Sequence, residues 1–353
     1  MTSELMMKDM TKAELRVARY LKRQLFDLPP GAALPTVRSI VQACSAGQHT
    51  IQGVFHKFCE LGLLETRWGQ GVFRGETPLL PSDMRVLVYS EEPFAHRRTG
   101  FRDELVAAVC EELAQRGWDH LVQIATDLGG DLRLQAEIEG KTVDAAVLVG
   151  AESPGLGSGL EALEIPAIHL IPATAEMPKP AIAVAPDPVV ETQIAYLLSK
   201  GRRRIAYLHP LEPGHMHRDF LFRREAFYRL VAEKGLPHHP GWVRYAGGDD
   251  AETVGVVREI MSGDEPPSGM ILHDEQAPSV YRALRELNIE PERDVCLVGT
   301  DNLSLAEEVE PPLTTVDVSR RELARAGAHA LDELLHNRAV DDLQWLPAKL
   351  IPR

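Results

Sequence analysis

The first 75 residues carry apolar positions at helical spacing, followed by two short extended arms. A helix is expected after Thr11, because its hydroxyl can cap the helix while Glu14 returns a hydrogen bond to the cap's own amide. Two more apolar stripes flank the Ser-Ala-Gly step at 45–47 and predict two more helices. Gly69 and Gly71 then lie between the extended arms, which is typical of a β-hairpin. Three helices and a hairpin make a small winged unit. The three apolar stripes are Leu15, Ala18, Leu21 and Leu25; Ile40, Val41 and Cys44; and Ile51, Val54, Phe55 and Phe58.

Beyond this unit the pattern changes to short buried strands that alternate with helices, as in "RVLVYS" followed by "DELVAAVCEELAQRG". Such alternation predicts an α/β fold of parallel sheets covered by helices on both faces. About ten strands in some 260 residues fit two sheets better than one. We therefore expect a winged domain at 1–75, a linker at 76–84 and a two-lobed domain at 85–353, with lobe 1 at about 85–186 and 315–340 and lobe 2 at about 187–314 and 341–353.

Charge is divided unevenly between these parts. The whole chain has a net charge of −14. Residues 1–75 hold ten Lys and Arg against six Asp and Glu, which gives +4, whereas residues 76–353 hold 28 against 46, which gives −18. A mildly basic head on an acidic body is an asymmetry that marks nucleic-acid-binding ends.

Composition disfavours several classes of protein. No apolar run approaches the roughly 18 residues of a membrane span, and the start of the chain lacks the apolar stretch of a signal peptide. We therefore expect a cytoplasmic protein that has no membrane partner. The cysteines lie far apart and form no C-x-x-C pair, so neither a disulfide framework nor a zinc site is expected, and no cofactor is predicted. We interpret them as small core residues: Cys44, Cys59, Cys110 and Cys296.

The third predicted helix begins with hydrogen-bonding side chains that have no core to face. Amide, imidazole and hydroxyl groups placed opposite an apolar stripe suit the base edges of a DNA major groove, and nearby arginines suit phosphates. The alternative is a helical hairpin that only packs. We expect DNA contacts from Thr36, Arg38, Gln48, His49, Thr50, Gln52, Arg67 and Gln70.

The same stretch resembles the winged helix-turn-helix of the GntR family. That family has an L-P-S-x-R-x-L-A pattern, a turn, a helix that ends in E-G-L-L, and a G-x-G wing. The matching residues are Leu34, Pro35, Thr36, Arg38, Ile40, Gly62, Leu63, Leu64, Gly69 and Gly71. The family carries arginine where Gln48 stands and more basic residues near Gln52, Gly53 and Gln70. Fewer cations imply weaker non-specific binding and a different operator sequence.

The body resembles the effector-binding domain of LacI/GalR-type repressors, which is similar to periplasmic sugar-binding proteins. Three segments carry this resemblance: "LLSKGRRRIAYL", "SGMILHDEQAPSVYRALRELNI" and "DVCLVGTDNLSLAEEVEPPLTTV". It extends from about Met84 to Arg353. A winged head on such a body resembles the arabinose-repressor subtype.

The resemblance implies an effector site. By family position Arg223 clamps the ligand, His273 stands where asparagine is commoner, and Asp301 accepts bonds from hydroxyls. The alternatives are that Asp301 caps the following helix and that His273 is only a loop residue. Phe94 follows the first strand, where it stacks on a sugar face or serves as a rim hydrophobe. Asp187 is a weaker candidate.

Other motifs give weaker evidence of function. His209, His215 and His217 lack a carboxylate or cysteine at metal-binding spacing, so no metal is expected. No Ser-His-Asp or Cys-His arrangement and no G-x-S-x-G elbow is recognised. The two resemblances imply a homodimeric repressor that binds palindromic operator DNA and a carbohydrate effector, and the lack of a catalytic set favours this over an enzyme. A sugar-binding protein or an enzyme with the same type of body is the alternative.

Overall fold

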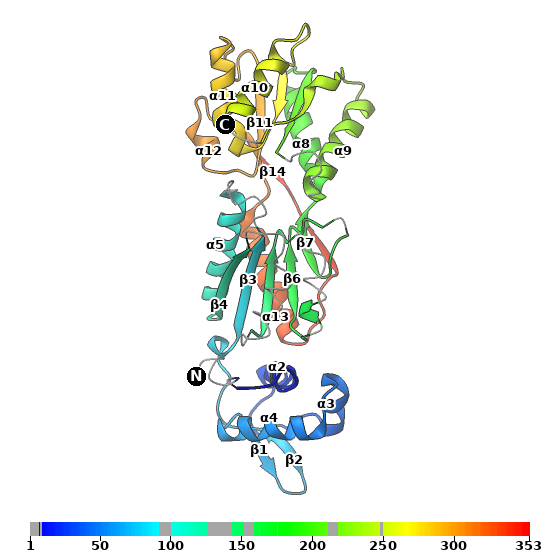
Figure 1. The fold of residues 1–353 in the computed structure, drawn as a ribbon, viewed down its shortest axis with the longest axis vertical. Helices are drawn as coiled ribbons and strands as arrows, with labels where there is room; N and C mark the ends of the chain where they lie inside the picture. Colours follow the sequence, from blue (N-terminus) through cyan, green and yellow to red (C-terminus); the bar gives the residue numbers. More distant parts are fainter. Residues whose placement is uncertain are drawn as a thin grey trace.

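The computed structural model describes residues 7, 9–91, 100–125, 143–151, 159–161, 163–174, 176–210, 218–247 and 250–353. Figure 1 shows three bodies in a row: a head, a first lobe and a second lobe. The head packs α2, α3 and α4 over one apolar core, and an antiparallel hairpin of β1 and β2 follows α4. The capping box predicted at Thr11 and Glu14 is present. The bounds are α2 Lys12–Asp27, α3 Val37–Cys44, α4 Gln48–Glu60, β1 Leu64–Arg67 and β2 Gly71–Arg74.

Lobe 1 is built on a parallel sheet in the order β13-β7-β6-β5-β3-β4. Its central strand β5 is buried along its whole length, as expected for a sheet with both faces covered. Helices α5 and α13 pack beside each other on this sheet. The bounds are β3 Arg85–Glu91, α5 Gly100–Gln115, β4 Asp119–Ala125, β5 Ala145–Val149, β6 Ala167–Leu170, β7 Ala181–Val184, α13 Arg320–Leu335 and β13 Leu343–Leu346.

Lobe 2 repeats this design with the strand order β14-β12-β11-β10-β8-β9, in which only the β12–β14 pair is antiparallel. Two helices, α8 and α9, pack together on one side, and α10 packs with α11. The bounds are α8 Pro186–Ser199, β8 Ile205–His209, α9 Arg218–Glu233, β9 Val243–Tyr245, α10 Asp250–Met261, β10 Gly269–Ile271, α11 Ala277–Glu286, β11 Cys296–Thr300, α12 Leu305–Glu308, β12 Thr315–Asp317 and β14 Lys349–Ile351, with short 3-10 turns at Pro240–Trp242 and Asp274–Gln276. A further 3-10 turn, Pro81–Asp83, precedes β3 of lobe 1.

Two strands lie in the opposite lobe from the one that the sequence predicted. Residues 315–317 were expected in lobe 1, but β12 pairs with β11 of lobe 2. Residues 343–346 were expected in lobe 2, but β13 pairs with β7 of lobe 1. The prediction was wrong here because strand pairing between distant segments is set by the sheets and not by local pattern. The chain therefore passes between the lobes three times, after β7, after β12 and after β13.

Candidate DNA interface and effector site

Helix α4 lies next to the hairpin, on the side of the head away from the lobes (Figure 1), and it begins with polar residues. Gln48, His49 and Gln52 are exposed, and Thr50 is half-buried. The opposite side of α4 enters the head core, as its apolar stripe predicted. This arrangement places hydrogen-bonding groups where a recognition helix needs them.

Helix α3 carries two of the predicted DNA contacts. Thr36 is its N-cap, and the hydroxyl accepts a hydrogen bond from the backbone amide of Ser39 at 3.2 Å. Arg38, two residues on, is exposed. The local role of Thr36 is thus to start the helix, and the guanidinium of Arg38 is the group that projects from the surface.

The hairpin differs from the expectation in the state of its arginine. Arg67 lies with its guanidinium 4.3 Å from the ring centre of Phe73 and pairs with Glu65 at 3.2 Å, so the hairpin itself holds this cation. Gln70 is exposed, and so is Trp68, which sequence reasoning missed. A tryptophan beside Gly69 in a hairpin turn is a signal that could have been found, because large aromatic residues rarely stand free in water.

The positive charge of the head is partly directed towards the protein itself. Arg74 donates to the carbonyl oxygens of Leu63 and Gly75 at 3.0 and 3.3 Å, and it is buried. Arg19 and Lys22 on α2 are buried against lobe 1. The +4 count from the sequence therefore overstates the charge that faces outward.

Helix α2 is joined to lobe 1 by charged groups that are almost wholly buried. Lys22 Nζ lies 2.7 Å from Asp144 Oδ2, with side-chain exposures of 0% and 1%, and donates to the carbonyl of Asp83 at 2.6 Å. Arg19 Nε donates to the carbonyl of Val143 at 2.6 Å. Burial lowers the pKa of Lys22, although the charge and hydrogen bond of Asp144 oppose that shift. We call these contacts the α2 joint.

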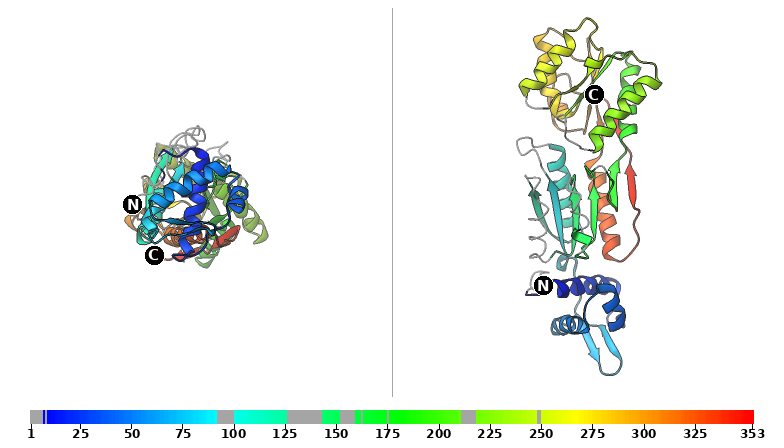
Figure 2. Two further views of the ribbon diagram at one scale, coloured as in Figure 1. Left: turned by 90° about the horizontal axis from the view of Figure 1, so that it is seen from below. Right: turned by 45° about the vertical axis from the view of Figure 1, so that its right-hand side comes forward.

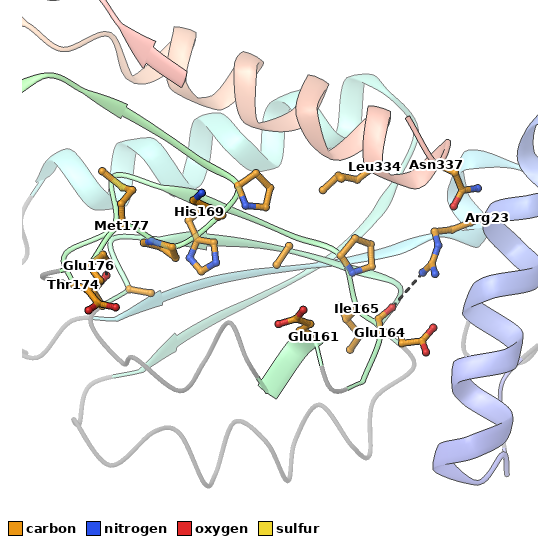
Figure 3. Close-up of a pocket in the computed structure, with 16 residues that line it drawn as sticks. Arg23, Glu161, Glu164, Ile165, His169, Thr174, Glu176, Met177, Leu334 and Asn337 are labelled. Atoms are coloured by element: carbon orange, nitrogen blue, oxygen red, sulfur yellow. Dashed lines mark hydrogen bonds between the residues drawn. The ribbon is translucent and has the colours of Figure 1, made fainter. Parts of the chain in front are cut away.

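The α2 joint extends along the helix towards its end. Arg23 donates to the carbonyl of Glu164 at 3.2 Å, beside a pocket of about 970 Å³ (Figure 3). The ring of Phe26 meets His336 edge-on at 5.2 Å between ring centres. Because the contacted loops precede β5 and β6, the head is attached to the amino-terminal edge of the lobe 1 sheet.

The predicted effector residues gather at the carboxyl-terminal edge of the lobe 2 sheet. His273 follows β10 and Asp301 follows β11, and His273 Nδ1 lies 3.4 Å from Asp301 Oδ2. Burial opposes ionisation of Asp301, but the hydrogen bond and charge of His273, with two arginines, outweigh it and hold the pKa of Asp301 below its usual range. Phe220 meets the ring of His273 edge-on at 5.0 Å.

Arg223 belongs to the same group. It is buried on α9, one turn after the buried Asp219, and its charge acts on both Asp219 and Asp301. Burial raises the pKa of Asp219, with the charge of Arg223 opposing that shift. Arg223 Nε is buried and has no hydrogen-bond partner among the described residues. An unpaired buried donor has a large free-energy cost, so this atom suits a ligand oxygen.

The lobes meet at Asp301. Arg320, from α13 of lobe 1, donates to the carbonyls of Asp301 and Asn302 and pairs with Glu104 of α5 at 2.8 Å. The backbone amide of Arg218 in lobe 2 donates to the carbonyl of Ala173 in lobe 1 at 3.0 Å. A change in the position of Asp301 therefore affects contacts in both lobes.

Asp274, which the sequence analysis did not single out, links the segment after β11 to the start of β12 at this edge of the sheet. Its carboxylate accepts from the amide of Leu303 at 2.8 Å and from the hydroxyl of Thr315 at 2.8 Å. Burial, aided by the charge of Asp301, raises the pKa of Asp274 to about 7. A Cβ at Gly299 would stand 2.0 Å from this carboxylate, so the close approach requires glycine. Its place beside His273 was the available signal.

Asp187 lies apart from this group. Asp187 opens α8 and pairs with Arg229 at 2.9 Å in an exposed ion pair, which gives it a surface role. Phe94 lies outside the described residues, as do His215 and His217. In the described part of the chain, no group of three or more His, Cys, Asp or Glu is arranged to hold a metal ion. None of the described helices is long and apolar enough to cross a membrane.

Comparison with known proteins places the second half of the chain. Residues 194–353 match the family described as periplasmic binding protein-like domain. The body of this chain thus has the periplasmic-binding-protein-like fold that the sequence predicted. The ribose operon repressor of Escherichia coli K12 is 30% identical over 166 residues, which is 44% of this chain and 46% of that protein. The repressor PurR of Vibrio parahaemolyticus is 30% identical over 159 residues, 42% of this chain and 45% of the relative. The chain thus spans under half the length of these relatives.

Solved structures extend the likeness in fold. The transcriptional regulator CelR in complex with cellobiose superposes with a TM-score of 0.67 at 19% identity, over 91% of this chain and 99% of CelR. The Lac repressor dimer bound to operator and the anti-inducer ONPF gives a TM-score of 0.66 at 19% identity, over 76% of this chain and 93% of that structure. At this identity the likeness concerns the fold alone.

Proposed function

We propose that this protein is a sequence-specific DNA-binding transcriptional repressor controlled by a small carbohydrate that binds between its lobes. The observation that carries the proposal is the placement of two sites on one chain. An exposed polar helix and a hairpin form the outer end of the head, whereas Arg223, His273 and Asp301 gather where the lobes meet. The repressor names of the relatives with a similar body support it.

The head is proposed to act as a GntR-type winged helix-turn-helix, which makes the chain similar to the arabinose-repressor subtype. Three helices followed by a two-stranded wing support this assignment. Helix α4 then enters the major groove, and the wing lies beside it. The domain limits proposed for DNA binding are 1–75, followed by a short connection at 76–84.

Two copies are proposed to bind together on a palindromic operator. One head buries too little surface for tight binding at physiological salt, and paired heads span half-sites about 34 Å apart or a multiple of that distance. Edge strand β4 supports a homodimer, because Val122 and Ile124 are 43% and 46% exposed on it. Joining two heads through the body raises the effective concentration of the second head.

The test of the function is selection of DNA from a pool of random duplexes by the full chain, with and without candidate sugars. We expect a palindromic motif to be enriched in one of these conditions. If none yields a motif, the protein is not a regulator of this type, and the sugar-binding or enzymatic alternative is favoured. A thermal-shift screen of sugars and sugar phosphates identifies the effector, since a ligand at 100 times its Kd adds about 2.7 kcal/mol of stability.

Replacing Arg38 with alanine is expected to weaken binding to all duplexes alike. The exposed guanidinium neutralises one phosphate, so its loss should reduce the slope of log affinity against log salt by about 0.9. Titration of fluorescent duplexes at several salt concentrations measures this slope. Arg203→Ala removes an equal charge from the exposed surface of lobe 2 and should leave the slope unchanged. An Arg38→Ala slope equal to that of the wild type would remove Arg38 from the interface.

Replacing Asp301 with alanine is expected to weaken effector binding about 10- to 100-fold. The loss of a buried carboxylate leaves ligand hydroxyls and His273 without an acceptor, a cost of about 1–3 kcal/mol. Titration calorimetry with the sugar found in the thermal-shift screen measures the affinity. Asp264→Ala removes an exposed carboxylate of lobe 2 and is the matched control. Equal affinity in Asp301→Ala and the wild type would exclude Asp301 from the site.

A further inference from the structure

Trp68 stands free at the tip of the wing. Its exposed fraction is 98%, whereas Trp118 and Trp242 are 5% exposed and Trp345 is 43% exposed. Figures 1 and 2 show the hairpin at the far end of the head, beyond α4 and opposite lobe 1. A side chain this exposed has no part in the core of the head.

The backbone that carries Trp68 is held firmly. Four residue pairs join β1 to β2, from Leu64 with Arg74 to Arg67 with Gly71. The amide of Gln70 closes the turn on the carbonyl of Arg67 at 3.0 Å. The segment 31–34 adds hydrogen bonds to the outer side of β2, at 2.8 to 2.9 Å. The wing thus presents its tip in a fixed direction.

The turn exposes an indole and an amide, whereas its arginine contacts other residues of the hairpin. Arg67 contacts Phe73 and Glu65 within the hairpin, whereas the indole of Trp68 and the amide of Gln70 are the exposed side chains of the turn. A tip that served only to neutralise phosphate would place its charge outward. This one offers a flat apolar surface next to a hydrogen-bonding group, and the hairpin lies beside α4 on the side of the head away from the lobes.

We propose that Trp68 inserts into the minor groove beside the major groove that α4 occupies, and wedges against a base step there. The inference rests on the proposed function and deepens it. The minor groove is about 6 Å wide, too narrow for a helix but wide enough for one side chain on a turn. Apolar side chains inserted from that groove partly unstack a step and bend the duplex. Flexible pyrimidine–purine steps then favour binding at a position that α4 does not contact.

Affinity measurements with the full chain test the wedge on a duplex enriched by the wild-type protein. We expect Trp68→Ala to lose about 10- to 100-fold in affinity, and Trp68→Phe to retain most of it. The salt slope should stay at its wild-type value, because indole carries no charge. Trp345→Ala, which removes a half-exposed tryptophan of lobe 1, should bind as the wild type does.

Fluorescence locates the contact directly. Trp118 and Trp242 are buried and Trp345 lies in lobe 1, so the change in emission on adding the duplex should come from Trp68 and disappear in Trp68→Phe. Replacing the flexible step opposite the wing with a stiff A-tract should reduce the affinity of the wild type more than that of Trp68→Ala.

The outcomes separate this inference from the function on which it rests. If a motif is selected but Trp68→Ala binds it with wild-type affinity and emission does not change, the wedge is wrong and the repressor stands. If Trp68→Ala abolishes dimer formation instead, the residue belongs to a protein interface and the wedge is overturned. If no duplex is selected at all, both the function and the wedge fail.

Discussion

Replacing Lys22 with methionine is expected to destabilise the protein by about 3–5 kcal/mol. The substitution leaves Asp144, only 1% exposed, buried without the cation that compensates its charge. The carbonyl of Asp83 also loses its donor. Urea unfolding measures the loss, and amide hydrogen exchange should show increased opening of α2 and of the loop before β5.

Two further variants make this result specific. Lys12→Met removes an exposed cation from the same helix and should cost far less stability, because exposed ion pairs contribute under about 1 kcal/mol. The double variant Lys22→Met with Asp144→Asn removes both charges of the ion pair and should be more stable than Lys22→Met, because neither partner is left buried alone. Arg19 loses the attraction of Asp144 in this variant but keeps its hydrogen bonds to the carbonyls of Val143 and Leu163. A Lys22→Met protein as stable as the wild type would mean that the α2 joint does not hold in solution.

The α2 joint also bears on control of DNA binding. It fixes the head to the amino-terminal edge of the lobe 1 sheet, so that a movement of lobe 1 carries the head with it. If the effector changes the arrangement of the lobes, DNA and effector affinities are coupled by about 1–3 kcal/mol, and the coupling is reciprocal. The double variant, stable but without the ion pair, should retain both binding activities and lose part of this coupling.

The free energy of unfolding of the wild type is expected to fall relative to that of Asp274→Asn as the pH rises from 5 to 8. The pKa of Asp274 is raised to about 7 in the folded protein, against 3.8 as its ordinary value. The folded state therefore keeps a proton that the unfolded chain releases, and the stabilisation present below pH 4 is lost as the pH rises through 7. Between pH 5 and pH 8 this amounts to about 3 kcal/mol, whereas asparagine does not titrate.

Unfolding of wild type and Asp274→Asn at pH 5 and pH 8 measures that difference. Asp264→Asn, at an exposed position of lobe 2, should follow the wild type at both pH values. Because Asp274 binds the amide of Leu303, two residues after Asp301, its ionisation also bears on the effector edge. Parallel stability curves for wild type and Asp274→Asn would show that the carboxyl titrates normally.

The sequence by itself determined the elements and the broad architecture. The capping box at Thr11, the apolar stripe of α4 and the wing glycines are local patterns, and local patterns decide where helices and turns form. The alternation of strands and helices was enough to predict two parallel sheets. The resemblance to LacI/GalR-type repressors implied that His273 and Asp301 belong to one site, and both follow parallel strands, which end at one edge of a sheet.

Only the tertiary structure decided which distant groups became partners. In the sequence Lys22 is one of several basic residues of the head. In the structure it forms a buried ion pair with Asp144, 122 positions away, which attaches α2 to lobe 1. The exchange of β12 and β13 between the lobes has the same origin, because a strand's neighbours are chosen by the sheet that it joins. Burial likewise separates Trp68 from the two core tryptophans, although all are the same residue in the sequence. Pairing and burial depend on the whole fold, and local periodicity carries no information about either.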